Sequence, residues 1–183
     1  MNDPQRIDVI ELLGPLRRYA KSLTRDDSRA DDLVQDTLLR AYERRGTFSS
    51  SGNLRGWLLS ILHNIFIDER RRWTADRLRD QQMAEVIEQV APPEQEARVQ
   101  LDQIKEAFLL LPEDQRAALH LVAIEGLSYQ EAASALNIPV GTLMSRLGRA
   151  RAALRAFEAG VGPLQIAASK PRPNLRVVGG SDD

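Results

Sequence analysis

A run of arginines with no acidic residue among them lies near the C-terminal end of this chain. Its members are Arg146, Arg149, Arg151 and Arg155. A guanidinium group pairs with phosphate and can form two parallel hydrogen bonds to guanine, so these residues could bind DNA. Thr142 and Ser145 lie on the same segment, and their hydroxyl groups can reach phosphates or base edges. The solvated face of an ordinary helical hairpin would carry the same residue types.

The residues that must position these arginines, 127–154, read LSYQEAASALNIPVGTLMSRLGRARAAL and predict a helix-turn-helix. Ser128 and Glu131 have the spacing of a capping box at the start of the first helix. Asn137 tolerates a left-handed backbone and ends that helix, with Pro139 just beyond it. Helical spacing of apolar residues then resumes at Val140, Leu143 and Leu147. Because such a motif places its second helix in the major groove, we interpret the arginine segment as a DNA-binding helix.

An acidic segment, residues 28–44, predicts a helix with one face suited to another protein. Its buried stripe is expected at Ala30, Leu33, Val34, Thr37, Leu38, Ala41 and Tyr42. The residues left on the outside include Asp31, Asp32, Gln35, Asp36 and Leu39. One apolar side chain among acids and an amide matches the apolar centre and charged rim of a helix-on-helix contact. A solvated acidic face, with its first aspartates at the positive end of the helix dipole, fits the composition equally well.

A third segment, residues 54–72, predicts a helix that could hold single-stranded nucleic acid. Its buried stripe is expected at Leu54, Trp57, Leu58, Ile61, Leu62, Ile65 and Phe66. Its outward side is expected at Arg55, Ser60, His63, Asn64, Asp68 and Arg71. Trp73 lies outside the stripe and could stack on an unpaired base. The preceding loop, with Phe48 and Asn53, could wrap such a base or be plain surface.

Composition excludes several other classes of protein. The 183 residues include no cysteine and only two histidines, His63 and His120, so we expect no disulfide, metal site or cofactor. No nucleophile–base pair or glycine-rich phosphate loop is recognisable, which predicts a protein that is not an enzyme. Without a signal peptide or a long apolar run, the expected location is cytoplasmic. The net charge of −1 conceals separate acidic and basic clusters, which suggests two different partners.

Helical periodicity without strand-like alternation predicts an all-α protein of two small helical domains joined by a flexible linker, the second ending in the helix-turn-helix. We place the first domain at residues 1–74, the linker at 75–100, the second domain at 101–158 and a disordered tail at 159–183. The linker contains Pro92 and Pro93, which favour an extended chain.

Three more helices are expected from the remaining apolar periodicity. The first, residues 7–23, has a buried stripe at Ile10, Leu13, Leu16 and Ala20. Pro15 either kinks this helix or stands in its first turn, with the helix starting near Gly14. Helices at 94–111 and 113–125 open the second domain, and their apolar sets include Ile104 and Ile124.

In combination, three motifs resemble the bacterial extracytoplasmic-function sigma factors, small members of the sigma-70 family. They are ADDLVQDTLLRAY (30–42), LRGWLLSILHNIFIDERRR (54–72) and LPEDQRAALHLVAIEGLSYQEAASALNIPVGTLMSRLGRARAAL (111–154). The resemblance covers both helical domains in the family's order and spacing, and the last motif is the most specific. Two positions depart from common forms: Met144 stands where a basic residue is frequent, and Asn137 where glycine is frequent.

The resemblance implies a promoter-recognition subunit of RNA polymerase that an anti-sigma factor controls. The residues it implies at core RNA polymerase are Asp31, Asp32, Gln35, Asp36 and Leu39. The residues it implies at the −10 element of the promoter are Asn53, Arg55, Asn64, Asp68, Arg70 and Arg71. The residues it implies at the −35 element are Thr142, Ser145, Arg146 and Arg149.

Two other functions fit part of the same pattern. A helix-turn-helix regulator that works without polymerase would leave the acidic face of residues 31–39 without a purpose. A sigma mimic that sequesters an anti-sigma factor would lack DNA-binding arginines and, in the known family, would carry a receiver domain. Promoter-dependent transcription with core polymerase distinguishes a sigma factor from both.

Overall fold

The computed structural model describes residues 9–49, 52–79 and 96–159, with side chains for 9–49, 52–74 and 103–159. Every regular element in these ranges is helical, as the sequence predicts. The first unit contains α1 (Val9–Thr24), α2 (Asp27–Glu43), the short 3-10 helix η1 (Arg45–Thr47) and α3 (Leu54–Arg79). The second unit contains α4 (Glu96–Leu110), α5 (Glu113–Leu119), the π-helical turn η2 (His120–Ile124), α6 (Tyr129–Ala135) and α7 (Val140–Glu158). The proline pair of the expected linker and the expected tail lie outside the described residues.

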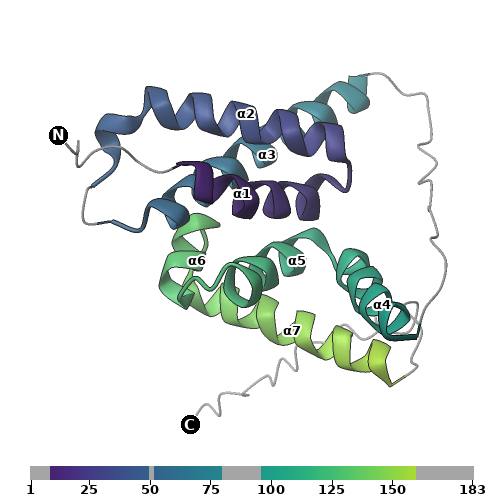
Figure 1. The fold of residues 1–183 in the computed structure, drawn as a ribbon. Coiled ribbons are helices and arrows are strands. Elements are labelled where there is room, and N and C mark those ends of the chain that lie inside the picture. The colour runs from purple at the N-terminus through teal and green to yellow at the C-terminus, as the bar shows by residue number, and fades with distance from the viewer. Residues whose placement is uncertain (1–8, 50–51, 80–95, 160–183) are drawn as a thin grey trace, which may run out of the picture.

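The helices α1 and α2 lie side by side and run in opposite directions (Figure 1). The chain reverses at Arg25, whose φ of 57° lies in the left-handed region. Asp26 then caps α2, because its side chain accepts a hydrogen bond of 2.7 Å from the backbone N–H of Arg29. α1 continues without a break through Pro15, so the alternative start near Gly14 is wrong.

Some residues assigned to the buried stripes or apolar sets of the helices are exposed. They are Ile10, Leu13, Tyr42, Ile104 and Ile124. Ile10 and Tyr42 are 78% and 68% exposed, and both lie at the end of the hairpin where α1 starts and α2 finishes. Burial in α1 is concentrated in its second half, where Tyr19 contacts His63 of α3 and His120 of the second unit. Periodicity assigns a residue to a face of a helix, but it does not show how much of that face another element covers.

The loop before α3 is ordered by a side-chain cap and by two aromatic rings. Asn53 Oδ1 accepts a hydrogen bond of 3.1 Å from the backbone N–H of Gly56 in the first turn of α3. The rings of Phe48 and Trp57 lie 5.2 Å apart, and Trp57 is half-buried against the core, as expected. α3 extends past the predicted end at residue 72 and finishes at Arg79.

The turn between α6 and α7 has the geometry that its sequence predicts. Ser128 and Glu131 form a complete capping box at the start of α6. Asn137 has a φ of 52°, and the backbone N–H of Ile138 donates to the carbonyl of Ala133, which closes a Schellman motif. Pro139 is the N-cap of α7. The helix-turn-helix is therefore present.

The two units pack against each other, an arrangement that the sequence does not predict. In Figure 1, α1 and α3 of the first unit lie against α5 and α6 of the second, and one buried apolar cluster continues across both units. Tyr19 is fully buried at this junction, with its ring 5.1 Å from that of His120. Several of the predicted functional residues consequently face the other unit.

Candidate nucleic-acid and protein interfaces

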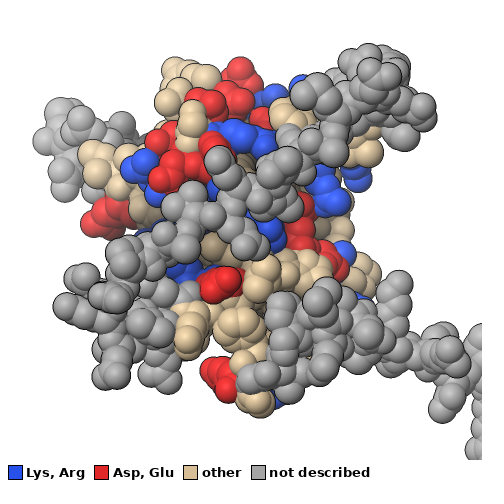
Figure 2. Space-filling model, turned by 90° about the vertical axis from the view of Figure 1, so that its right-hand side faces the viewer, with Lys and Arg blue, Asp and Glu red and all other residues tan. Residues whose placement is uncertain are grey.

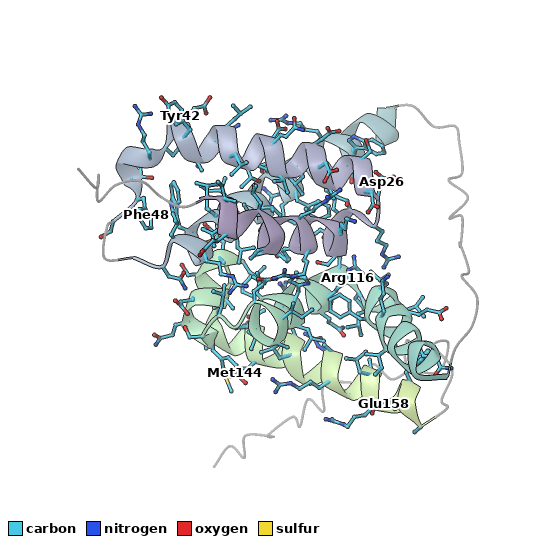
Figure 3. All side chains as sticks on the ribbon, viewed as in Figure 1. Asp26, Tyr42, Phe48, Arg116, Met144 and Glu158 are labelled. Carbon is cyan, nitrogen blue, oxygen red and sulfur yellow. The ribbon has the colours of Figure 1, made fainter. Side chains whose placement is uncertain are left out.

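The second helix of the helix-turn-helix presents the expected polar residues along one side. α7 buries Leu143, Leu147, Ala150 and Ala153 against its own unit. Ser145 and Arg149 are exposed and Thr142 is half-buried. Met144 is exposed and points away from the first unit (Figure 3). The outer face of α7 thus offers hydroxyl and guanidinium donors, interrupted by one apolar side chain.

Arg146 is more enclosed than its neighbours on α7. Its side chain is 23% exposed, and Nε lies 3.3 Å from Oδ2 of Asp114 on α5. The Asp114 carboxylate holds the Arg146 guanidinium in one orientation. The side chain of Asp114 is itself nearly half exposed. Less than a quarter of the Arg146 side chain is therefore open to a ligand that approaches along α7.

The acidic face of α2 is exposed as the sequence predicts. Asp32, Gln35 and Asp36 are exposed, and Leu39 is 64% exposed among them. Asp31 is half-buried because it forms an ion pair with Arg17 of α1, with 2.8 Å between Nε and Oδ1. Figure 2 shows Asp and Glu side chains gathered over the upper part of the molecule, with Lys and Arg between them. An apolar side chain inside a charged rim is the arrangement of a protein-docking surface.

Glu69 of α3 extends this acidic face, although it is not among the residues predicted to lie there. Burial, together with the negative charges of Asp36 and Asp32, raises the pKa of its carboxyl, while Arg29 and Arg72 act in the opposite direction. In the sequence, Glu69 follows Asp68 and precedes three arginines, in the segment DERRR. Only the packing of α3 against α2 brings Glu69 close to Asp32 and Asp36.

The six residues expected at the −10 element divide into two groups. Asn64, Asp68 and Arg71 are exposed on α3. The other three contact carboxylates of the second unit, namely Asn53 with Glu131, Arg55 with Glu125 and Arg70 with Glu113. The contact with Asn53 lowers the pKa of the Glu131 carboxyl, and the Ser128 cap adds to this effect.

His63 does not lie on the outward side of α3, contrary to the prediction. It is buried, and its Nδ1 and the hydroxyl of Tyr19 form a hydrogen bond of 2.9 Å. Burial, assisted by the positive charge of Arg146, lowers the pKa of His63 to about 4, and burial raises that of Tyr19. His63 is therefore a neutral core residue at pH 7.

Glu125 is the centre of the polar junction between the units. Its side chain has no exposed surface, and it is contacted by Arg18 of α1, Arg55 of α3 and His120 of η2. Burial acts to raise the pKa of Glu125, but hydrogen bonds from His120 and Arg55 and the charges of Arg55 and Arg18 outweigh it. The resulting pKa is below the ordinary value. The carboxylate is ionised and joins three elements.

A second buried charge, Arg116 of α5, lies between the units (Figure 3). Its Nε donates to the carbonyl of Ser22 near the end of α1, and its Nη1 donates to the carbonyls of Leu109 and Leu111 around the end of α4. Cations are favoured at helix C-termini, where unpaired carbonyls gather. Burial nevertheless lowers the pKa of Arg116 to about 10.

The aromatic residue proposed for base stacking is half-exposed on α3. Trp73 lies beneath the guanidinium of Arg29, 4.9 Å from the ring centroid. Across the part of the chain that the structure describes, no group of His, Asp and Glu residues could hold a metal ion. The described helices include none that is long and apolar enough to cross a membrane.

The fold and these surfaces are those of a two-part transcription initiation factor. Residues 9–80 match the sigma-70 region 2 family, and residues 101–154 match sigma-70 region 4. The chain is 40% identical over 160 residues, 86% of either protein, to the ECF RNA polymerase sigma factor EcfG of Rhodopseudomonas palustris. It belongs to the ECF group of the sigma-70 family, whose members bind core RNA polymerase and direct promoter-specific transcription initiation.

Two solved structures share the fold over most of this chain. One is the sigma factor RpoE of Bartonella quintana in complex with the anti-sigma factor NepR, with a TM-score of 0.71 and 33% identity. The match covers 83% of this chain and 94% of that one. The other is CnrH in complex with the cytosolic domain of CnrY, with a TM-score of 0.60 and 27% identity. It covers 84% of this chain and 86% of that one.

Proposed function

We propose that the three surfaces of this ECF sigma factor divide the work of initiation between them. The outer face of α2, with Asp31, Asp32, Gln35, Asp36 and Leu39, contacts core RNA polymerase. The start and outer side of α3, with Asn53, Arg55, Asn64, Asp68, Arg70 and Arg71, engage the −10 element. The outer face of α7, with Thr142, Ser145, Arg146 and Arg149, contacts the −35 element.

The geometry of α7 carries the proposal for the −35 element. A Schellman turn at Asn137 directs α7 away from α6, and the apolar residues of α7 face inward. Arg149 and Ser145 consequently lie on the surface that would enter a major groove. The exposed Leu39 within an acidic rim supports the polymerase contact on α2, because an apolar centre with a charged rim is the composition of a protein-docking surface.

The proposed role is recognition, and the chemistry of transcription belongs to the polymerase. We therefore assign no catalytic residue to this chain. Since it works on core RNA polymerase, we place it in the cytoplasm.

We also propose that an anti-sigma factor regulates this chain. The support is its similarity to a sigma factor solved in complex with NepR, over 83% of its length. A helix that covers the exposed face of α2 or the end of the α1–α2 hairpin would find apolar anchors there, Leu39, Tyr42 and Ile10.

Run-off transcription tests the proposed function directly. Core polymerase plus this chain should produce promoter-dependent transcripts from genomic templates, and core polymerase alone should not. A polymerase-independent regulator would bind promoter DNA without changing the output of core polymerase. A sigma mimic would bind an anti-sigma factor and yield no transcript.

A further inference from the structure

Met144 lies near the start of α7, on the exposed side of that helix. α7 begins at Val140, and Met144 is 55% exposed and points away from the first unit (Figure 3). Its neighbour Ser145 is exposed as well. In a helix-turn-helix, the N-terminal residues of the second helix contact base edges in the major groove. If α7 binds the −35 element as proposed, Met144 therefore lies where a side chain reads bases.

Exposure alone does not make this methionine functional, because single apolar side chains are common on protein surfaces. The residues around Met144 are what distinguish it. Residues three and four positions apart are neighbours on the surface of a helix, so Gly141 and Gly148 flank Met144 on α7. Neither glycine carries a side chain that would shield Met144 from a ligand.

The two glycines also leave the backbone of α7 open to a close approach. A methyl group added at Gly141 or Gly148 would meet no described atom within 4 Å, apart from the chain neighbours and the backbone of α7 itself. Neither has a positive φ, and glycine is less favourable than alanine inside a helix. Packing among the described residues therefore gives no reason for glycine at these positions. Their missing side chains do permit the edge of a base pair to lie close to Met144.

Thymine carries the apolar group that base pairs present in the major groove. Its 5-methyl group lies beside a hydrogen-bond acceptor, whereas the recognition groups of guanine, adenine and cytosine are donors and acceptors. The methionine side chain is flexible and polarisable, and its thioether sulfur is only a weak acceptor. Against a G·C pair it would remove water from polar groups without replacing their hydrogen bonds. Met144 is thus suited to an A·T pair whose thymine methyl group faces α7.

We infer, on the basis of the −35 role proposed above, that Met144 selects an A·T pair in the −35 element through an apolar contact with the thymine 5-methyl group. The hydroxyl and guanidinium groups of α7 supply hydrogen bonds, and Met144 adds discrimination at a position read without one. Removing one methyl group from such a contact corresponds to a loss of affinity of about fourfold.

The test uses holoenzyme reconstituted from core polymerase and this chain, on a promoter that the holoenzyme transcribes. Each thymine of the −35 element, on either strand, is replaced in turn by deoxyuridine, which removes the 5-methyl group and keeps the donors and acceptors of the base pair. Run-off transcription is measured at a holoenzyme concentration that does not saturate the promoter. With the native chain, the replacement at one position should lower transcription about fourfold.

Substitutions of Met144 show whether this response depends on its side chain. Met144→Ala should transcribe the thymine template as weakly as the native chain transcribes the deoxyuridine template, and should change less than about 1.5-fold between the two templates. Met144→Leu keeps an apolar side chain of similar volume and should retain a response of about twofold or more. Ile124→Ala is the matched control and should keep the native response, because it truncates a side chain of comparable exposure, 47%, outside α7. Circular dichroism establishes that each variant is folded.

The inference is overturned if the native chain responds to the loss of no thymine methyl group, as it must if the element contains no A·T pair. An equal response in Met144→Ala and the native chain overturns it as well. Arg149→Ala separates these results from a failure of the proposed function. If only the inference is wrong, Arg149→Ala lowers transcription from every template, and no response to deoxyuridine depends on Met144. If α7 does not contact the −35 element, Arg149→Ala leaves transcription unchanged.

Discussion

Arg146 of α7 is oriented before it meets a ligand, because Asp114 holds its guanidinium from the neighbouring α5. A side chain fixed in this way loses little conformational entropy on binding, which suits it to reading one base pair. Arg149 is exposed, and among the residues that the structure describes no acid holds it as Asp114 holds Arg146. The two arginines therefore should not be equivalent.

Arg146→Ala should relax promoter preference at one position of the −35 element, at a cost of about 1–3 kcal/mol for the preferred base. Arg149→Ala is the comparison and should weaken all promoters uniformly, with a smaller salt dependence of binding. Transcription from a library of −35 variants measures both effects. An unchanged preference profile in Arg146→Ala would contradict a base contact by this residue.

His63 makes the stability of the protein depend on pH. Its pKa of about 4 in the folded chain lies below the ordinary histidine value of 6.5, so over this range the unfolded chain binds a proton that the folded chain excludes. The free energy of unfolding should therefore fall by up to about 3 kcal/mol as the pH drops from 6.5 towards 4, with no such contribution above 7.

His63→Gln provides the matched comparison, because glutamine can accept the Tyr19 hydrogen bond but does not titrate. Denaturant unfolding at several pH values should show a shallower loss of stability in this variant between pH 6.5 and 5. Parallel curves for the two chains would mean that folding does not lower the pKa of His63.

At the scale of elements, α2 carries its proposed polymerase contact on the face opposite its buried stripe, where Leu39 is exposed and Tyr42, three residues further along, is exposed as well. An apolar side chain that becomes buried at the centre of a charged rim adds hydrophobic energy to a small interface. Leu39→Ala and Asp36→Lys should each weaken binding to core polymerase about tenfold, with little effect on −35 DNA. Surface binding assays measure the affinity for polymerase and for DNA. Glu11→Lys on α1 is the control, because it makes the same change of charge outside the proposed contact. Equal losses for polymerase and DNA would contradict the assignment.

The helix α6 is short, and its capping box stabilises its first turn. Ser128→Ala removes the hydroxyl that accepts the Glu131 backbone N–H, so the free energy of unfolding should fall by about 1 kcal/mol. Ser134→Ala, at an exposed position of the same helix, should be close to neutral. Chemical denaturation of the two variants provides the measurement, and equal effects would show that the cap contributes nothing.

At the scale of the whole molecule, Arg116 joins the carbonyl ends of α1 and α4, one from each unit. Arg116→Met keeps most of the side-chain volume but removes the donor to the Ser22 and Leu111 carbonyls, which should cost about 2 kcal/mol or more. Calorimetry should resolve one unfolding transition in the native chain and two in the variant, because the units lose part of what couples them. Arg151→Met, at an exposed position, should keep the single transition. One transition in both variants would show that the apolar contacts alone unite the molecule.

Local sequence signals predicted the helices and their ends with few errors. The Ser128–Glu131 box, Asn137 and Pro139 are short-range features, and the structure has each of them. The errors fall on side chains whose environment depends on distant segments. His63 shares a helix face with polar residues, yet Tyr19, 44 positions earlier, provides the buried partner that its sequence neighbours do not reveal.

The sequence by itself determined the all-helical class, the helix-turn-helix and the exposed acidic face of α2, because capping, turn chemistry and apolar period act over a few residues. Only the tertiary structure decided that the two units close on each other and that Asn53, Arg55 and Arg70 are paired with acids. Those contacts join residues 43 to 78 positions apart. Their free energy depends on burial and on the orientation of several helices at once, and no local pattern of residues encodes it.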